Sequence, residues 1–495
     1  MEQTGGSRLA IIAVVFMAVI GVFLIFLFPG SPEQDVDYHF LMARTAWVDH
    51  FYFVDVWGRP LFTTLFALVA WLGFVPARFF ALGISLAAAW QTYRLACDLR
   101  MSRAWLVIPF LLGQQTFFEL YSNLFTEPLF ALILVVALRC HISGRIKSGM
   151  LVASLLPLAR PEGVFLCLFW GLWSLNAGSA RERGVRMGTS GDVVPCYKRV
   201  VGRLGITIIL ASGVVGWWFA ALLLTGDPLF ILHNWPATWH TDMYGHGTFL
   251  SYARRSYEFA GVILIVPFIL GLLRGFRSWS LSLITSVFLV LFLLHSIFVK
   301  YGLFGEAGFP RYMVSVAPAI AVLTLEGWNT IFSVKVLRPL AIAAGWVVII
   351  FSILQSVYYL DSMVWTRDAV AIDEMANWLQ EQDPSLPGLI WSNGRMCIVL
   401  NRNLKDSPPV GNREKLFTVL EKAPAGTVVF WDSEIGTNWF GTTSAEIEGR
   451  GYKVLTSRHY SLPALIFPPG RFPWIDLLFP IPSREIELSL LKREH

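Results

Sequence analysis

Charged side chains are scarce in this chain of 495 residues, at 15% of the total. Soluble domains carry nearer a quarter. Hydrophobic residues make up 55% of the sequence, and the mean hydropathy is +0.58. This imbalance excludes an ordinary soluble enzyme and indicates a polytopic helical membrane protein, because several apolar runs approach the roughly 20 residues that a helix needs to cross a bilayer.

Net charge and cysteine are also low. The formal charge is only +5, and Lys and Arg are spread over loops between apolar runs. That spread excludes a nucleic-acid-binding surface and is typical of the loops that orient a membrane protein. There are five cysteines, and only Cys397 falls on the outer side in the orientation argued below, so we expect no disulfide framework there.

Apolar runs predict about eleven membrane-spanning helices. The first run is longer than a signal-peptide core and no small-residue cleavage site follows it, so we expect an uncleaved signal anchor. Residues 61–75 either cross as a further span or form a helix that lies in the membrane interface. The predicted spans are residues 9–28, 79–97, 104–118, 128–140, 149–159, 163–176, 204–224, 259–273, 279–298, 312–333 and 339–360.

The distribution of Lys and Arg favours an orientation in which residues 61–75 do not cross. With a cytoplasmic N-terminus, every cytoplasmic loop is then basic, as the positive-inside rule requires. The carboxylates collect on the opposite face, although they were not used to choose the orientation. We therefore expect a multi-pass protein of the cell (inner) membrane with its active site on the extracytoplasmic side. The outer carboxylates are Glu33, Asp35, Asp37, Asp49, Asp55, Glu119, Glu127, Glu162, Asp227, Asp242, Glu258 and Glu306.

The composition changes after Leu360. An amphipathic helix pattern at 368–382 precedes short apolar runs that are separated by turns rich in Pro and Gly. This pattern predicts a small soluble α/β domain on the outer face. The predicted organisation is a transmembrane catalytic domain at 1–360 and an extracytoplasmic α/β domain at 361–495.

Two carboxylates and an imidazole follow the first span within five residues, as Asp35, Asp37 and His39. A carboxylate within hydrogen-bond reach of an acceptor hydroxyl can act as a general base, and two close carboxylates push their pKa values apart or share a cation. The simpler interpretation of this segment is a solvated acidic loop. The continuation of this segment to Arg59, before a proline and the helix at 61–75, favours function.

Three further motifs lie at outer ends of spans. Glu127 opens a span beside a proline, and Arg160 and Glu162 share a tight turn. Glu306 and Arg311 precede a late span, where a guanidinium is a suitable clamp for a lipid-linked phosphate. Each motif also has a structural explanation: a helix start, an ion pair across a turn, or an anchor in the lipid headgroups. The loop 226–258 contains His and Asp, but their spacing matches no tetrahedral metal site, so no metal ligand is assigned.

Taken in order, these motifs resemble those of the GT-C superfamily of integral-membrane glycosyltransferases, most closely the protein mannosyltransferase and lipopolysaccharide glycosyltransferase branches. The resemblance covers roughly residues 9–360. It implies a GT-C-like fold and transfer of a sugar, a hexose such as mannose, from a polyprenyl-phosphate donor on the outer face. The implied partners are that donor, membrane lipids and an acceptor that is a glycan, lipid or protein, with no nucleic acid.

The resemblance also implies residue roles. Asp35 or Asp37 activates the acceptor hydroxyl for an inverting displacement, and Val36 separates the pair that is adjacent in many family members. Glu127 and Glu162 orient the acceptor or sugar, while Arg160 and Arg311 hold phosphate. His39, Arg59 and Glu306 are assigned to the same substrate site. Some relatives need a divalent cation and others do not, so metal dependence stays open.

Two other functions fit parts of the sequence. A polytopic transporter or flippase for lipid-linked glycans would have many spans, but no internal repeat of the kind found in many transporters is present. An O-antigen polymerase or ligase would have large outer loops rich in Arg and His, and the loop 226–258 keeps this alternative open.

Overall fold

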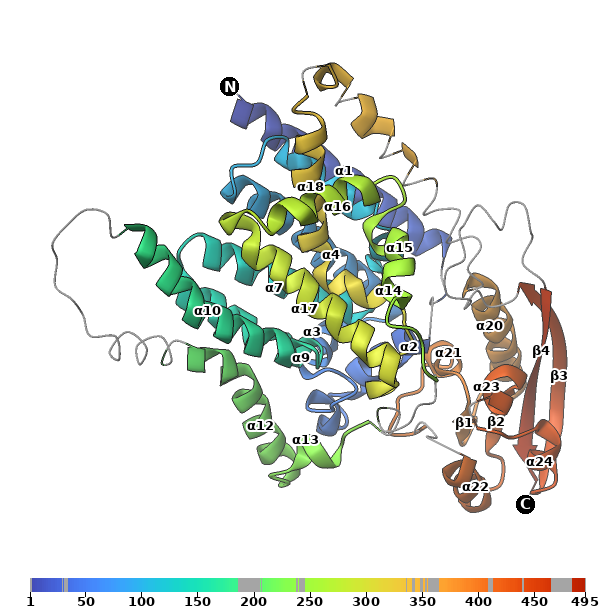
Figure 1. The fold of residues 1–495 in the computed structure, drawn as a ribbon. Helices are drawn as coiled ribbons and strands as arrows, with labels where there is room; N and C mark the ends of the chain where they lie inside the picture. The colour runs from blue at the N-terminus through green and yellow to red at the C-terminus, as the bar shows by residue number, and fades with distance from the viewer. Residues whose placement is uncertain are drawn as a thin grey trace. The chain divides into compact units, whose positions relative to one another are not determined.

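The computed structural model describes most of the chain. The described residues are 2–28, 30, 34–185, 205, 207–236, 239, 245–334, 336–340, 343–347, 350–351, 354, 365–407, 413–438, 440–463 and 483–494. Helices make up 69% of the described residues. The chain divides into two compact units, and Figure 1 labels their helices and strands.

Unit 1 comprises residues 1–22, 54–62 and 81–357, and the regular elements among its described residues are helices. Its helices follow from the long apolar runs, since every backbone polar group inside a bilayer needs an internal partner. The main elements are most of α1 (Glu2–Leu27) and α4 (Phe74–Asp98), α5 (Val107–Leu112), α6 (Gln115–Leu120), α7 (Thr126–Ile142), α8 (Ile146–Ala153), α9 (Leu156–Ala159), α10 (Gly163–Val185), α12 (Ser212–Thr225), α13 (Phe230–His233), α14 (Ser251–Arg254), α15 (Ser256–Ala260), α16 (Ile265–Gly275), α17 (Trp279–Tyr301), the 3-10 helix η6 (Pro310–Val316) and α18 (Ala317–Ile331).

Within the described part of the chain, five helical stretches are long and apolar enough to cross a membrane. They are Gly6–Leu27, Phe74–Asp98, Ile208–Thr225, Trp279–Tyr301 and Pro310–Ile331. The total of about eleven stays a prediction, because several other runs form shorter helices and much of 339–360 lies outside the described residues. Helix α3 (Pro60–Ala70) has 11 residues, a length of roughly 16 Å at 1.5 Å per residue. It is too short to cross alone, which favours the interfacial interpretation of residues 61–75.

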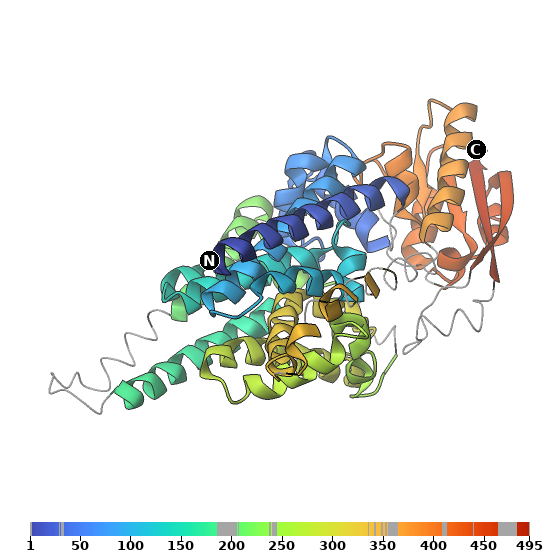
Figure 2. The ribbon, with the colours of Figure 1, turned by 90° about the horizontal axis from the view of Figure 1, so that it is seen from above.

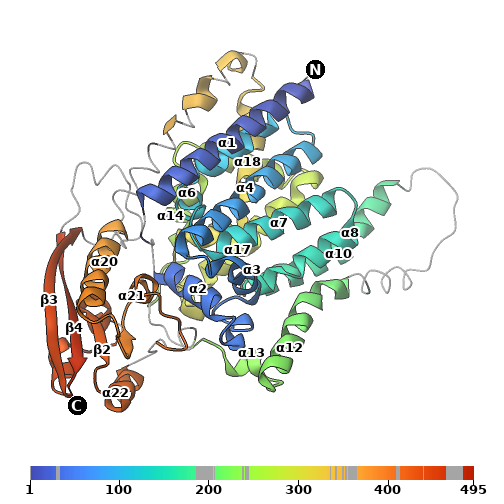
Figure 3. The same cartoon turned by 180° about the vertical axis from the view of Figure 1, so that it is seen from behind.

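Small residues let the helices of unit 1 approach closely. A Cβ at Gly271 of α16 would collide with the carbonyl of Leu323 in α18, and one at Gly327 of α18 would collide with the carbonyl of Pro267. Such contacts between backbones are typical of helix pairs in membranes. Figure 3 shows α7, α8 and α10 running beside one another in the same unit.

Unit 2 comprises residues 23–53, 63–80 and 358–495, so two N-terminal stretches group with the C-terminal segment. The N-terminal part holds α2 (Gln34–Thr45), η1 (His50–Phe53) and most of α3. The C-terminal part holds α20 (Trp365–Gln382), β1 (Leu389–Trp391), α21 (Gly394–Val399), α22 (Arg413–Lys422), β2 (Val428–Asp432), α23 (Ser433–Asn438), α24 (Ser444–Glu448), β3 (Tyr452–Pro463) and β4 (Ser483–Arg493).

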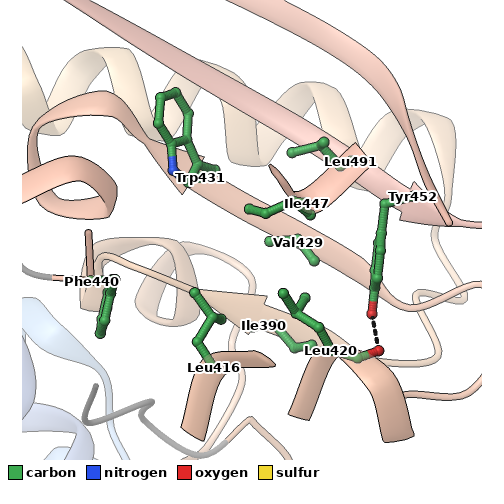
Figure 4. Packing of buried hydrophobic residues seen from close by; sticks show 9 residues of the cluster. All are labelled: Ile390, Leu416, Leu420, Val429, Trp431, Phe440, Ile447, Tyr452 and Leu491. Carbon is green, nitrogen blue, oxygen red and sulfur yellow. Dashed lines mark hydrogen bonds between the residues drawn. The ribbon is translucent and has the colours of Figure 1, made fainter. Parts of the chain in front are cut away.

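The C-terminal segment forms a four-stranded sheet in the order β1-β2-β4-β3, with β1 and β2 parallel and the other pairs antiparallel. Helix α20 lies along the β3–β4 pair (Figure 2). Apolar side chains from the strands and from α22 and α24 form the core around Val429, Leu420 and Leu491 (Figure 4). The α/β arrangement expected for this segment is therefore present, with α20 covering the predicted helix at 368–382.

Candidate active site

A buried ion-pair cluster in unit 1 is built on the turn between α9 and α10. The N–H of Gly163 donates to the carbonyl of Arg160 at 3.0 Å, and a Cβ at Gly163 would collide with the backbone of Leu156. Only glycine permits this approach. The sequence Arg-Pro-Glu-Gly therefore fixes Arg160 and Glu162 on one short turn.

Arg160 connects this turn to the start of α7. Its Nη1 lies 2.6 Å from Oε1 of Glu127 and donates to Oγ1 of Thr126 at 3.0 Å. Its Nε donates to Glu162, and its guanidinium lies 4.9 Å from the ring centre of Tyr312. A buried charge is tolerated only when it is paired, and here one guanidinium neutralises carboxylates from two segments.

Arg311 approaches the same carboxylate from η6. Its Nε lies 3.9 Å from Oε1 of Glu127, beyond hydrogen-bond length. Its guanidinium is surrounded by the rings of Phe125, Phe309 and Tyr312, with ring centres 5.1, 5.0 and 5.6 Å away. Aromatic faces attract a cation and also exclude water from it. Arg311 is thus a desolvated cation at the edge of the cluster.

A histidine network extends the cluster toward Glu306. Nδ1 of His295, in α17, lies 2.7 Å from Oε2 of Glu306, whose other oxygen accepts from the hydroxyl of Tyr252. The other ring nitrogen of His295 lies 3.8 Å from Oε1 of Glu162, and the ring stacks on Tyr312 at 5.2 Å. Glu306 therefore orients the imidazole so that its Nε2 faces the Arg160 turn.

The ionisation states follow from these contacts. Burial opposes the charge of Arg160, but Glu127 and Glu162 outweigh burial and raise the pKa of its guanidinium. Burial likewise opposes the charge of Glu162, but Arg160 and His295 lower the pKa of its carboxyl. Arg160 and Glu162 are consequently both charged at neutral pH.

Arg59 adds a third guanidinium from the segment before α3. Its backbone is left-handed at φ 60°, its Nη1 donates to the carbonyl of Val56 at 2.7 Å, and it lies 5.1 Å from the ring centre of Trp239. Burial and then the charge of Arg160 lower the pKa of Arg59 to about 10. Among the described residues its buried Nε has no hydrogen-bond acceptor, so this cation has capacity for an anion.

The structure therefore brings together six predicted site residues from four separate stretches of the chain. Their assignment to substrate binding remains a prediction, whereas their proximity is a property of unit 1. These residues are Arg59, Glu127, Arg160, Glu162, Glu306 and Arg311.

The other predicted site residues lie in unit 2, on α2. The interpretation of this segment as a loop is wrong: Asp35 and Asp37 occupy the first turn of a helix, where acidic residues suit the helix dipole. Residues two apart on a helix do not share a face. Asp37 is 2% exposed and His39 is buried, whereas Asp35 is only half-buried. The helix thus distinguishes two carboxylates that the sequence left equivalent.

Sequence reasoning missed two residues of the cluster, His295 and Tyr252. His295 is an ionisable side chain within a mostly apolar helix, which is by itself a reason to suspect function. Tyr252 carried no such signal, because a tyrosine near a membrane surface is expected on other grounds.

No group of three His, Cys, Asp or Glu side chains is arranged to hold a metal ion within the described ranges. In the loop 226–258, Nδ1 of His233 lies 2.8 Å from Oδ2 of Asp227, while His240 and Asp242 lie outside the described residues.

No protein-family model matches the chain, and no curated protein matches it in sequence. Its fold is similar to crystal structures of ArnT from Cupriavidus metallidurans. The apo structure aligns with a TM-score of 0.58 at 11% identity, covering 99% of this chain and 98% of that one. The structure bound to undecaprenyl phosphate aligns with a TM-score of 0.60 at 11% identity, covering 98% of both chains. The chain therefore has an ArnT-like fold, which agrees with the membrane fold that the sequence resemblance predicted.

Proposed function

We propose that this chain, which has the fold of a GT-C glycosyltransferase, transfers a sugar from a polyprenyl-phosphate donor to an acceptor on the extracytoplasmic side of the membrane. The observation that carries the proposal is the convergence of six sequence-predicted residues in one buried, charged cluster. The ArnT structure with undecaprenyl phosphate supports a lipid phosphate as the ligand class. That fold does not favour a transporter, a flippase or an O-antigen polymerase or ligase.

The arginines of the cluster have different proposed roles. Arg160 already neutralises Glu127 and Glu162, so it holds the cluster together. Arg59 has a buried donor without an acceptor among the described residues and a neighbouring cation that a phosphate would offset. We assign Arg59 and the desolvated Arg311 to the donor phosphate, since guanidinium groups bind phosphate oxygens with strong, charge-assisted hydrogen bonds.

Asp37 is the proposed general base. As the acceptor oxygen attacks the anomeric carbon, its proton passes to the carboxylate of Asp37 and a new glycosidic bond forms. The bond between the anomeric carbon and the phosphate oxygen breaks, and polyprenyl phosphate leaves with both electrons. Configuration at the anomeric carbon is inverted. The burial of Asp37 favours it over the more exposed Asp35, because close packing restricts a buried side chain to a defined rotamer.

The experiment that tests this function presents membranes containing the protein with a panel of undecaprenyl-phosphate sugars and identifies products by mass spectrometry. We expect one donor to yield a glycosylated acceptor. The first donor to test carries a hexose such as mannose. A variant with Asp35→Asn and Asp37→Asn is the matched control and should give no product. Wild-type turnover by that variant would exclude the proposed base, and no product from any donor would exclude the function.

A further inference from the structure

The C-terminal α/β segment packs directly on the helix that carries the proposed base. Helix α21 contacts α2 within unit 2 (Figures 1 and 3). A Cβ at Gly394, the first residue of α21, would lie 3.1 Å from Cβ of Asp37 and 3.4 Å from Cδ1 of Leu41. Distances this short leave little room for any side chain at 394. The glycine therefore lets the backbone of α21 lie against the turn that bears Asp37.

The next residue, Arg395, places a cation at this contact. Its side chain is 9% exposed, and its Nε and Nη2 donate to the two oxygens of Asp373 in α20, each at 2.7 Å. Its backbone N–H donates to the side chain of Asn393 at 3.0 Å, and its guanidinium lies 5.6 Å from the ring centre of Phe74. A bidentate pair together with a ring contact fixes a guanidinium more firmly than a single bond does.

The charges of Arg395 and Asp37 interact. Burial lowers the pKa of Arg395, but the hydrogen bond to Asp373 and the charges of Asp37 and Asp373 outweigh burial and raise it. The interaction is mutual, so Arg395 stabilises the ionised form of Asp37. A general base must be ionised before it can accept a proton.

We propose that Arg395, held in place by Asp373, is a positioning residue that orients Asp37 and keeps it ionised, so that the C-terminal segment completes the acceptor-activating part of the enzyme. The inference rests on the proposed function, because it assigns Asp37 as base. It gives the α/β segment a direct part in the reaction.

Several other ionisable groups lie on the elements that pack around Asp37. Burial raises the pKa of Tyr38 above its ordinary value, so this phenol stays neutral and adds no charge. Cys397 in α21 is buried and its pKa is raised by burial, so it is neutral as well. The remaining groups from the elements packed here are Asp35, His39 and Arg44 on α2, Arg78 on α4, and Asp373 on α20.

The first test compares the pH profiles of sugar transfer in the full-length protein. For Arg395→Gln we expect turnover at neutral pH to fall about tenfold, because Asp37 is no longer held in its orientation. The acidic limb should move up by about one pH unit, because a nearby opposite charge shifts a carboxyl pKa by roughly 1–3. Arg395→Lys should restore part of both effects. The control is Arg413→Gln, which removes an ion pair of equal length to Glu446 but is 52% exposed. An unchanged acidic limb in Arg395→Gln overturns the proposal, whatever happens to the rate.

The second test uses the glycine contact. Gly394→Ala should lower kcat with little change in KM for the donor, because it displaces the turn that carries Asp37. Gly449→Ala is the matched control, since an added Cβ there would lie 3.5 Å from the nearest atom. Equal kcat in the two variants would contradict the proposed contact.

A third measurement separates this inference from the proposed function. The band of protonated Asp37 in the infrared spectrum of the purified protein can be identified by its loss in Asp37→Asn. Its titration midpoint should lie at higher pH in Arg395→Gln than in the wild type. Equal midpoints would refute the role of Arg395 even if transfer is observed, whereas an absence of transfer by the wild type would refute the proposed function alone.

Discussion

The buried cluster of unit 1 and the region around Asp37 in unit 2 differ in how their charged side chains are paired. In unit 1, three arginines and three glutamates are interleaved, and Arg160 is bonded to carboxylates from two segments. In unit 2, the carboxylate of Asp37 lies on a buried helical face whose cationic neighbour, Arg395, is already engaged by Asp373. A compensated cluster suits the binding of a charged ligand, whereas a single oriented carboxylate suits proton transfer.

The largest expected effect concerns the two aspartates. Asp37→Asn should lower sugar transfer by at least about 100-fold, because general-base catalysis contributes roughly 10²–10⁴. Asp35→Asn should stay within about threefold of the wild type, since Asp35 is more exposed and lies on another side of α2. Initial rates at saturating donor measure both. An equal loss of sugar transfer in the two variants would show that Asp35 and Asp37 do not have different roles.

Loss of Arg160 should show that unit 1 depends on charge compensation. Arg160→Ala leaves Glu127 and Glu162 buried without their cation, and removing one partner of a buried pair costs about 3–5 kcal/mol. We expect a clearly lower unfolding temperature in detergent.

The control for this variant is Arg274→Ala. It breaks a pair with Glu326 in which the arginine is 55% exposed, so it should change stability by less than about 1 kcal/mol. If Arg160→Ala were as stable as this control, the cluster would not be held together by Arg160.

Arg59→Gln should affect binding more than folding. Gln keeps a non-glycine side chain at the left-handed position of Arg59, so the backbone strain is unchanged. We expect KM for the donor to rise about tenfold, in line with the loss of a charge-assisted bond of about 1.5 kcal/mol. Donor titrations and thermal unfolding measure the two effects. A lower unfolding temperature with unchanged KM would assign Arg59 to structure instead.

The smallest expected effect is on the pH dependence of stability. Because Arg160 and His295 lower the pKa of Glu162 in the folded state, Glu162 contributes stability at pH values above its unfolded pKa of about 4.3. That contribution is lost as pH falls through the lower, folded value. Glu162→Gln should therefore flatten the stability profile on the acid side. A profile with the same acid slope as the wild type would contradict the pairing.

The sequence predicted the residues of the unit 1 cluster better than their arrangement. Position and residue type identified Glu127, Arg160 and Arg311, because buried charges at span ends are costly and therefore informative. Their mutual pairing depends on how α7, α9 and η6 pack, and that packing is not encoded in local periodicity. His295 was missed although it carried a usable signal, as an ionisable residue within an apolar span.

Unit 2 was harder to predict because its contacts are distant in sequence. Arg44 on α2 donates to Asn401 across 357 positions, and Asp37 meets Gly394 across a similar separation. No local pattern in the segment after the first span predicts such partners. The acidic pair does not distinguish a loop from a helix, since carboxylates occur in loops and are also stabilising in the first turn of a helix.

The central claim is covalent transfer of a sugar from a lipid phosphate, with Asp37 accepting the proton. The most direct measurement follows wild-type and Asp37→Asn protein in membranes with the active donor, and quantifies glycosylated acceptor and released undecaprenyl phosphate by mass spectrometry. We expect equal amounts of the two products from the wild type and almost none from the variant. Donor that remains intact, or that only moves across the bilayer in the wild type, would contradict it.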